Sequence, residues 1–450
     1  MLKGYTKQEI SWMMYDWANS AHSVIIVTLL PIFFDTVAGY TADSVSSMST
    51  WGYATSIAML IVALAAPFLG VFGDIRGMRK KLFSFFMLLG VAACAGMAFT
   101  PGMNFTSGPV AAGKVASLIL VLYIVSVIGF DASAIYYDAF LTDVTTEDRM
   151  DKVSTMGYGL GYIGGSTIPL LIFLIMNLVG VPMLTCLAVV FGLTAVWWLA
   201  FSLPLLKNCE QTSGKPYEKG DVARSIKGVG TTIKEIIANK PMLIYILSYF
   251  FYIDGVHTVI SMATTYGTNL GLDSTGMMLA LLLVQILGLP FCLLYIKCSE
   301  KFGARTMVGF GICVYMFICI FAFFMNSLWQ FWVLAVLCAT SQGGIQALSR
   351  SMYGKLIPDK DRSGEFFAIR KQVGQFSSIM GPALVGVVSS VVANGMLGAQ
   401  GLTAQTATAE QIDAINAQSS HYGILSIIII IIVGAVLYFG FLPKAEHAKQ

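Results

Sequence analysis

The chain alternates between long apolar runs and short polar connections. Each run is close to the roughly 20 residues that an α-helix needs to cross a bilayer, and few charged residues interrupt it. The runs cover residues 11–34, 51–72, 82–100, 115–140, 154–178 and 183–204, and then 241–267, 275–296, 306–325, 328–349, 366–392 and 421–442. The pattern predicts an all-α polytopic membrane protein with twelve transmembrane helices.

One long polar segment, residues 205–240, divides these runs into two groups of six. We therefore predict an N-terminal six-helix bundle at 1–204, a cytoplasmic linker at 205–240 and a C-terminal six-helix bundle at 241–450. Within the linker, Ile226 and Ile233 belong to an apolar set with helical spacing beside basic residues, which is typical of a helix lying in the membrane interface. A solvated linker explains the same residues equally well.

A short polar hairpin, Gly70–Lys81, joins the second and third runs so tightly that the two helices must lie antiparallel. The hairpin carries an acid, a glycine and several basic residues, namely Asp74, Gly77, Arg76, Arg79, Lys80 and Lys81. A weaker copy about half a chain later has an acid, a glycine and an arginine at the same offsets, namely Glu300, Gly303 and Arg305. The repetition predicts two six-helix pseudo-repeats facing each other across a cavity.

Composition and charge placement agree with a membrane protein and orient it. The chain is 56% hydrophobic and only 11% charged, which is outside the range of soluble globular proteins. With both termini in the cytoplasm, every Lys and Arg except Lys114 falls on the cytoplasmic side, as the positive-inside rule requires. The eight cysteines show no metal-ligand spacing, so we expect no disulfide, no metal and no other cofactor.

Two of the membrane-spanning runs carry a polar residue and a histidine three positions apart, on one helix face. Asp254 and His257 form this pair in the seventh run, and Asn19 and His22 form it in the first. An Asp–His couple in a cavity can take up and release a proton. Alternatively, the histidines hydrogen-bond to neighbouring helices. We favour a functional role for Asp254, because an acid inside a membrane-spanning helix is costly, and leave the histidines open.

Three further acids lie in or near the membrane-spanning runs. Asp131 and Asp138 lie two turns apart on the fourth run and share a face. We expect Asp131 to line the cavity, and Asp138, near the cytoplasmic end, to pair with the basic hairpin. Asp16 lies about 8 Å inside the first helix, where an inner-gate ion pair and simple exposure at the helix mouth are both consistent with the sequence.

The glycines of the fifth run match a nucleotide-binding fingerprint only superficially. Gly159, Gly161 and Gly164 have the spacing of the dinucleotide motif, but that motif requires a preceding strand and a βαβ unit. Gly157, Gly161 and Gly165 recur every four residues, which lets a second helix approach closely. We interpret the glycines as a packing face. The chain shows no phosphate-binding loop or catalytic motif, and we do not expect an enzyme.

The hairpin resembles the signature between helices 2 and 3 of the major facilitator superfamily, and further segments resemble one branch, the vacuole-effluxer-like transporters of fungi and bacteria. These segments are Tyr15-Asp16-Trp17-Ala18-Asn19-Ser20, Tyr136-Tyr137-Asp138-Ala139-Phe140-Leu141, Gly161-Tyr162-Ile163-Gly164-Gly165, Asp254-Gly255-Val256 with Thr258, and Gly344-Ile345-Gln346-Ala347-Leu348-Ser349-Arg350-Ser351 followed by Ile357-Pro358 and Glu365-Phe366-Phe367. The resemblance implies the major facilitator fold and a secondary transporter, associated in fungi with amino-acid export from the vacuole.

The same resemblance places the hairpin acid against the start of the eleventh helix, where a helix N-terminus attracts a carboxylate. We therefore expect Asp74 to lie near Phe366–Arg370 and to close an inner gate. Arg370 and Lys371 either form ion pairs of this gate or meet an anionic substrate. The candidate gating and structural residues are Asp74, Arg76, Arg79, Asp138, Glu300, Arg305, Arg350 and Arg370.

We expect a secondary active transporter that works by alternating access and is coupled to a proton or another cation. Amino acids or small peptides are the favoured substrates, by resemblance alone. The candidate substrate- and cation-binding residues are Asp254, His257, Asn19, His22 and Asp131. We expect a monomer in a bacterial inner membrane rather than in an organelle membrane, with a small-molecule substrate, lipid around it and no nucleic-acid partner.

Two rival hypotheses remain. The end of the first run, Phe33–Val37, resembles the family of glycoside–cation symporters, but the acids that this family carries on its second helix are missing from the run 51–72. The other rival is a non-transporting membrane receptor or lipid scramblase, which predicts no solute accumulation and a groove open to lipid.

Overall fold

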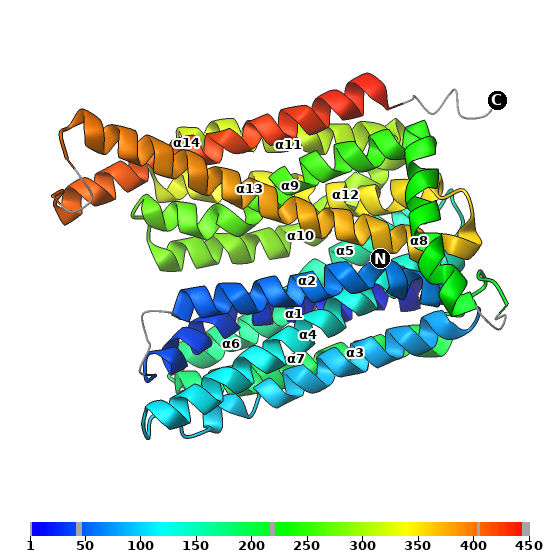
Figure 1. Ribbon diagram of the computed structural model, residues 1–450, viewed down its shortest axis with the longest axis horizontal. Helices are drawn as coiled ribbons and strands as arrows, with labels where there is room; N and C mark the ends of the chain where they lie inside the picture. Colours follow the sequence, from blue (N-terminus) through cyan, green and yellow to red (C-terminus); the bar gives the residue numbers. More distant parts are fainter. Residues whose placement is uncertain (1, 42–46, 217–220, 403–405, 443–450) are drawn as a thin grey trace. The chain divides into compact units, whose positions relative to one another are not determined.

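The computed structural model describes residues 2–41, 47–216, 221–402 and 406–442 (Figure 1). In this part of the chain, twelve helical segments are long and apolar enough to cross a membrane, which confirms the predicted number of spans. The first six are α1 (Lys7–Ala38), α2 (Ser47–Gly73), α3 (Met78–Met97), α4 (Pro109–Val144), a segment made of α5 (Met150–Gly161), η3 (Tyr162–Thr167) and α6 (Ile168–Leu178), and α7 (Met183–Asn208). The last six are α9 (Lys240–Asn269), α10 (Ser274–Phe302), α11 (Ala304–Phe323), α12 (Leu328–Leu356), α13 (Ser363–Ala399) and α14 (Ala409–Val436) with η5 (Leu437–Phe441).

Several helices begin earlier than the hydropathy pattern indicates, and in two of them a polar capping box marks the start. α1 follows Thr6, which forms a capping box with Glu9. α14 follows Thr408, which forms a capping box with Gln411, so this helix begins well before the predicted residue 421. The first turns of α14 are polar, and an apolar run cannot reveal them.

The chain folds into two compact units. The first unit contains Met1–Thr232 and Ile357–Lys371, and the second contains Ile233–Leu356 and Gln372–Gln450. The segment Ile357–Lys371 therefore belongs with the N-terminal helices, an assignment that the predicted division at 204 and 240 does not contain. The first turns of α13 lie in this segment, so α13 begins in the first unit and continues in the second.

The same pairs of helices pack together in both units, which fits the predicted duplication. In the first unit, the packed pairs are α1 with α7, α2 with α4, α3 with α4, and α3 with α7. The corresponding pairs in the second unit are α9 with α14, α10 with α12, α11 with α12, and α11 with α14.

The glycines of the fifth span form the predicted packing face against α1. A Cβ atom added at Gly161 would lie 2.6 Å from Ser20 Oγ, and one added at Gly165 would lie 2.6 Å from the Trp17 carbonyl oxygen. At Gly164, a Cβ would enter the Trp17 ring. The π-helical turn η3 lies at this contact. The two helices approach so closely here that no side chain larger than hydrogen fits at these glycines.

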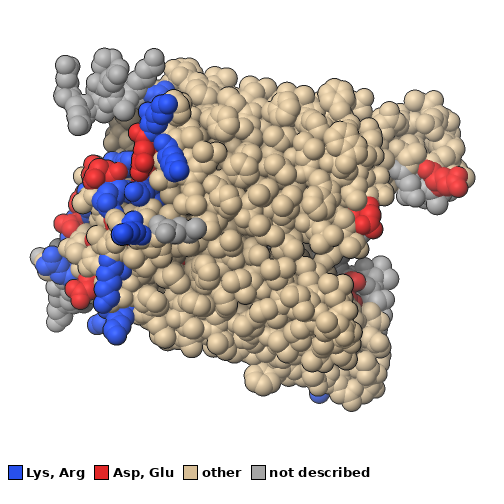
Figure 2. Space-filling model, turned by 180° about the vertical axis from the view of Figure 1, so that it is seen from behind, with Lys and Arg blue, Asp and Glu red and all other residues tan. Residues whose placement is uncertain are grey.

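The linker contains one helix, α8 (Asp221–Ala238), as the apolar spacing predicts. Its Ile233 and Ile237 are exposed while Ile236 is buried. Figure 2 shows Lys and Arg side chains gathered at one end of the helices and a broad uncharged surface along their length. The position of α8 at a membrane interface, and of the charged end in the cytoplasm, stays a prediction.

Candidate functional site

Arg79 is the centre of a buried polar cluster at the hairpin between α2 and α3. The side chain is fully buried. Nη2 donates to Asp74 Oδ1 at 2.8 Å and to Ser363 Oγ at 2.9 Å. Nη1 donates to Asp143 Oδ2 at 2.5 Å and to Ser213 Oγ at 3.2 Å. One guanidinium therefore joins the hairpin, the end of α4, the linker and the start of α13.

Asp74 completes this cluster by binding the N-terminus of α13. Its Oδ1 accepts from the Gly364 N–H at 2.7 Å, and its Oδ2 accepts from the Glu365 N–H at 2.8 Å. The contact falls just before the predicted Phe366–Arg370, because the free N–H groups of a helix lie in its first turn. Gly70 permits the approach, since a Cβ there would lie 2.6 Å from the Gly364 carbonyl oxygen.

The charge of Asp74 is set by opposing effects. Burial raises the pKa of Asp74 to about 7, while the Arg79 guanidinium and the N–H groups of Glu365 and Gly364 act to lower it. A single guanidinium is shared between two carboxylates, Asp74 and Asp143. The cluster is therefore short of positive charge when both acids are ionised, and protonating Asp74 relieves this.

The acid of α4 that pairs with the hairpin is Asp143, and the predicted pairing of Asp138 with the hairpin is corrected. Asp138 lies more than one turn earlier on α4 and pairs with Arg370 at 3.5 Å. The prediction ended this helix at residue 140, whereas α4 continues to Val144 and carries Asp143 to the level of the hairpin. Asp138 and Arg370, two predicted gating residues, are thus brought together.

The linker covers the cluster through contacts that no pattern in the sequence indicates. The Gln211 side chain accepts from the Gly77 N–H at 2.9 Å, and the Ser213 N–H donates to Asp143 Oδ1 at 2.9 Å. The Arg76 N–H donates to the Lys215 carbonyl oxygen at 2.9 Å, which pairs the two backbones locally. These contacts are made by polar residues without periodicity, so the sequence alone could not place them.

A second ion pair is formed two turns before Asp138, on the same face of α4. Lys371 Nζ is 2.8 Å from Asp131 Oδ1, and the Lys371 ammonium also lies over the Phe130 ring, 5.9 Å from its centroid. Asp131 is buried, while Lys371 keeps 24% of its side-chain area exposed. Consecutive residues of α13, Arg370 and Lys371, therefore bind acids two turns apart on α4.

His22 is enclosed by its own bundle. Its ring stacks on Phe130 with centroids 4.7 Å apart, approaches Trp198, and meets Ser126 Oγ through Nε2 at 3.3 Å. Asn19 is also buried, and the Asp16 carboxylate lies beside the packing face at Gly157. For His22, the arrangement matches the alternative of an interhelical hydrogen bond.

Asp254 is a buried carboxyl group in α9 that uses only one of its oxygens. Oδ1 accepts from the Gly381 N–H of α13 at 3.0 Å and from Thr258 Oγ1 at 3.3 Å. Oδ2 is buried and has no hydrogen-bond partner among the residues that the structure describes. The helices touch here because residue 381 is glycine, since a Cβ would lie 2.7 Å from Asp254 Oδ1. Pro382 follows and has no N–H for the helix ladder.

His257 faces the same helix as Asp254, as their spacing predicts. His257 Nδ1 meets Ser378 Oγ of α13 at 2.9 Å, one turn before Gly381. The hydrogen bonds of Asp254 go to Thr258 and Gly381, so the two predicted partners both bind α13 without bonding to each other. Their assignment to substrate or cation binding stays a prediction.

The copy of the hairpin in the second unit does not bury its acid. Glu300 is exposed, and Arg305 has a buried Nη1 with no hydrogen-bond partner among the described residues. The Arg305 carbonyl oxygen accepts from Tyr438 Oη at 3.0 Å. Arg350, at the end of α12, is buried.

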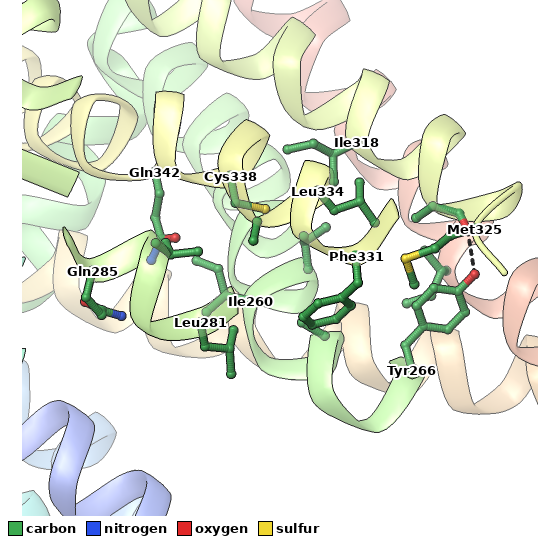
Figure 3. Close-up of a pocket in the computed structure, with 16 residues that line it drawn as sticks. Ile260, Tyr266, Leu281, Gln285, Ile318, Met325, Phe331, Leu334, Cys338 and Gln342 are labelled. Atoms are coloured by element: carbon green, nitrogen blue, oxygen red, sulfur yellow. Dashed lines mark hydrogen bonds between the residues drawn. The ribbon is translucent and has the colours of Figure 1, made fainter. Parts of the chain in front are cut away.

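A separate pocket lies inside the second unit (Figure 3). Its walls are mostly apolar and come from α9 to α12 with a contribution from α14, as Ile260, Leu281, Phe331 and Leu334 illustrate. Figure 3 shows Gln285 and Gln342 at one end, and at the other Tyr266, whose hydroxyl donates to the Ala322 carbonyl oxygen. Asp254 is not among the lining residues, so the pocket is distinct from the acid site.

Comparison with known proteins identifies the family. The family described as "Vacuole effluxer Atg22 like" matches residues 5–395. An MFS-type transporter of Bacillus subtilis, YxiO, described as uncharacterized, is 39% identical over 452 residues, covering 99% of this chain and 96% of YxiO. Autophagy-related protein 22-1 of Penicillium rubens is 25% identical over 263 residues, covering 53% of this chain and 44% of the fungal protein, so the match spans less than half of that relative.

Solved structures agree on the fold. The proton:xylose symporter XylE superposes with a TM-score of 0.70 at 15% identity, covering 97% of this chain and 95% of XylE. FucP, a major facilitator transporter in the outward conformation, superposes with a TM-score of 0.64 at 12% identity, covering 95% and 98%. At such identities the likeness concerns the fold alone. The chain belongs to the vacuole effluxer Atg22-like family and is a twelve-helix major facilitator transporter rather than an enzyme.

Proposed function

We propose that this protein is a secondary active transporter whose coupling proton or cation is bound at Asp254. The observation that carries the proposal is the buried Oδ2 oxygen without a partner. A buried ionised carboxylate needs compensation on both oxygens, and an acid inside a membrane-spanning helix is a functional candidate by default. A proton on Oδ2 would remove the buried charge, or a cation would bind this oxygen directly, and release of either leaves the site charged.

The position of Asp254 suits a coupling role because its partner helix also carries the inner gate. Gly381 lies ten residues beyond Lys371 on α13, about 15 Å at 1.5 Å per residue. The first turns of α13 are bound by Asp74, and the Asp254 carboxyl binds the same helix farther along. A change of charge at Asp254 alters its bond to the Gly381 N–H, and we propose that α13 transmits this change to the gate during alternating access.

The favoured substrates are amino acids or small peptides. Support comes from the family, described as vacuole effluxers, and from relatives named autophagy-related protein 22. The bacterial relative YxiO supports a bacterial membrane, and we propose the inner membrane, a monomer and cytoplasmic termini. His257, Asn19, His22 and Asp131 remain candidate cavity residues under this proposal.

The test is uptake into proteoliposomes that are acidic outside and neutral inside. Free amino acids, dipeptides, sugars and glycosides are offered as labelled solutes. Asp254→Asn removes the titrating group and keeps the shape of the side chain, so we expect gradient-driven accumulation to fall to background while exchange of the same solute across the membrane persists. Glu410→Gln, an exposed acid in the first turn of α14, is the matched control and should behave as wild type.

Each alternative gives a different result in this assay. Accumulation that is equal in wild type and Asp254→Asn would exclude Asp254 as the coupling site. Accumulation of a glycoside alone would favour the symporter hypothesis, although α2 contains no Asp or Glu. If no solute accumulates and a fluorescent phospholipid equilibrates between the leaflets instead, the transporter proposal fails in favour of a scramblase.

A further inference from the structure

We infer that the Asp131–Lys371 ion pair is the binding site for the charged ends of a zwitterionic solute. The solute's carboxylate would bind the Lys371 ammonium, and its ammonium would bind the Asp131 carboxylate, so that the solute inserts between the two side chains. The inference rests on the proposed transport of amino acids or peptides, and it assigns the residues that recognise them. Its chemical class of ligand is an α-amino acid or a short peptide with free termini.

The pair differs from the Arg79 cluster in how it is held. Arg79 is fully enclosed and bound from four segments, which leaves no room for a ligand. Lys371 has one carboxylate partner, Asp131 Oδ1, and keeps 24% of its side chain exposed. An ammonium has three N–H donors. Lys371 can therefore bind a second carboxylate from its exposed side before its ion pair with Asp131 breaks.

The exchange conserves the charges at the site. Opening a buried pair alone leaves two uncompensated charges, which is strongly unfavourable. A zwitterion supplies one opposite charge to each partner as the pair opens, so each side chain keeps a charge-assisted bond. A purely anionic or purely cationic solute compensates only one of them. The geometry therefore selects solutes that carry both charges close together.

The surroundings of the pair provide rings for the rest of the solute. The Phe130 ring lies beneath the Lys371 ammonium. On the same helix, two turns before Asp131, the Tyr123 ring contacts Trp51 of α2 in a tilted arrangement with centroids 4.4 Å apart, and its hydroxyl meets Thr55 Oγ1 at 3.2 Å. These groups lie within the first unit, so the site needs no residue from the second.

The pair also lies where α13 leaves the first unit. Lys371 is the last residue of the segment Ile357–Lys371 that belongs to this unit, and Gln372 is already part of the second. A solute that separates Lys371 from Asp131 removes the outermost of the bonds between α4 and α13, leaving Asp138–Arg370 in place. Binding of the solute would thus loosen the contact of α13 with α4 at the point where α13 passes from the first unit to the second.

The experiment measures binding to the purified full-length protein by isothermal titration calorimetry. The probes are L-leucine, L-phenylalanine, L-lysine and dialanine, each as the free compound, the methyl ester and the N-acetyl derivative. The proteins are wild type, Lys371→Gln, Asp131→Asn and the double variant, which carries no unpaired charge and so controls for folding. Lys360→Gln removes an exposed lysine that pairs with Glu147 near the same end of α13 and serves as the matched control.

We expect wild type to prefer the free compound over both derivatives. Lys371→Gln should lose about 10- to 100-fold in affinity for the free compound and hold or gain affinity for the ester, because the unpaired Asp131 attracts a cation. Asp131→Asn should show the mirror result and turn toward the N-acetyl derivative. The double variant should bind all three forms weakly, and Lys360→Gln should match wild type.

Three outcomes would overturn the inference. The first is an unchanged order of the three ligand forms in both single variants, which makes the pair structural. The second is proton-driven accumulation of another solute, such as a sugar, by a wild type that binds none of the zwitterions; the proposed transport then survives. The third is neither binding nor accumulation of any solute, which overturns the proposed function as well.

Discussion

The cluster around Arg79 and the site of Asp254 are both built on α13, and they treat buried charge in opposite ways. At the first, both terminal nitrogens of Arg79 donate hydrogen bonds, and both oxygens of Asp74 accept them. At the second, one oxygen of Asp254 binds α13 and the other has no partner in the described part of the chain. The Arg79 Nε is buried without a hydrogen-bond partner among the described residues, but the bonds of the two terminal nitrogens and of the Asp74 carboxylate fix the surroundings of the cluster. The half-bonded acid Asp254 is available to an ion.

The two hairpins also differ in their turns, although both place a glycine at the same point of the repeat. Gly77 and Gly303 occupy the same place in the repeat, and both adopt a positive φ, 80° and 82°, that favours glycine. Asp74 and Arg79 then build a buried cluster, while Glu300 is exposed. The ψ angle, however, is −2° at Gly77 and 149° at Gly303, so the repeat keeps the glycine but neither the geometry of the turn nor the role of the charged residues.

The largest effect is expected from removing the centre of the cluster. Arg79→Met leaves Asp74 and Asp143 buried without their cation, so we expect a loss of about 3–5 kcal/mol in the free energy of unfolding. Arg305→Met, at the equivalent position of the weaker copy, should cost less than about 1 kcal/mol, because its buried Nη1 has no partner to lose. Titration with a denaturing detergent measures the free energy of unfolding of both variants. Equal losses would show that the two arginines are equally important for stability, against this prediction.

A smaller effect is expected in the pH dependence of the free energy of unfolding, because Asp74 titrates at a different pH in the folded and the unfolded protein. Its pKa of about 7 in the folded protein exceeds the value of about 3.9 for an exposed Asp, so the folded state holds an extra proton between these values. The contribution of Asp74 to stability is therefore fully present below about pH 4 and lost as the pH rises through about 7. We expect a decline of about 1–4 kcal/mol relative to Asp74→Asn, which cannot titrate.

The control for this pH effect is Asp359→Asn, an exposed acid just before α13. Its pH profile should match that of wild type. If wild type and Asp74→Asn also show the same profile, the bonds from Arg79 and α13 fully offset the burial of Asp74, and the cluster is ionised throughout.

Membrane-length helices and the tight hairpin could be predicted from the sequence, because both depend on local patterns. Apolar runs set the twelve spans, and glycine spacing set the contact of the fifth span with α1. The partner of the hairpin was predicted only in part: the start of α13 was expected from resemblance, while Asp143 was missed because α4 runs farther than its apolar stretch.

The candidate sites were less predictable, because side-chain partners depend on packing between distant segments. Asp254 stands out in the sequence as an acid in an apolar run, but its bond to the Gly381 N–H depends on how α9 meets α13. The pairing of Asp131 with Lys371 joins residues far apart in the chain. No local rule connects them, and a single sequence contains no record of such contacts.

The contact of α9 with α13 should be intolerant of a single methyl group. A Cβ at residue 381 would lie 1.9 Å from Thr258 Oγ1, so we expect Gly381→Ala to cost about 1–3 kcal/mol in stability. Gly386→Ala, farther along the same helix, meets nothing within 4 Å and should be neutral or slightly stabilising. Thr258→Ala combined with Gly381→Ala should recover part of the loss; without recovery, the close contact lies elsewhere.

The smallest change in stability should accompany the largest change in function. Asp254→Asn keeps an oxygen for the Gly381 N–H, and the substitution breaks no bond to Oδ2 from the described residues. We expect the free energy of unfolding to change by less than about 1 kcal/mol, whereas Asp131→Asn leaves the Lys371 ammonium without its carboxylate and should cost more. Detergent denaturation of both variants beside the uptake assay separates the two roles. A large loss of stability in Asp254→Asn would mean that Asp254 holds α9 to α13 as an ordinary structural acid. The Asp254 site would then not differ in kind from the Arg79 cluster.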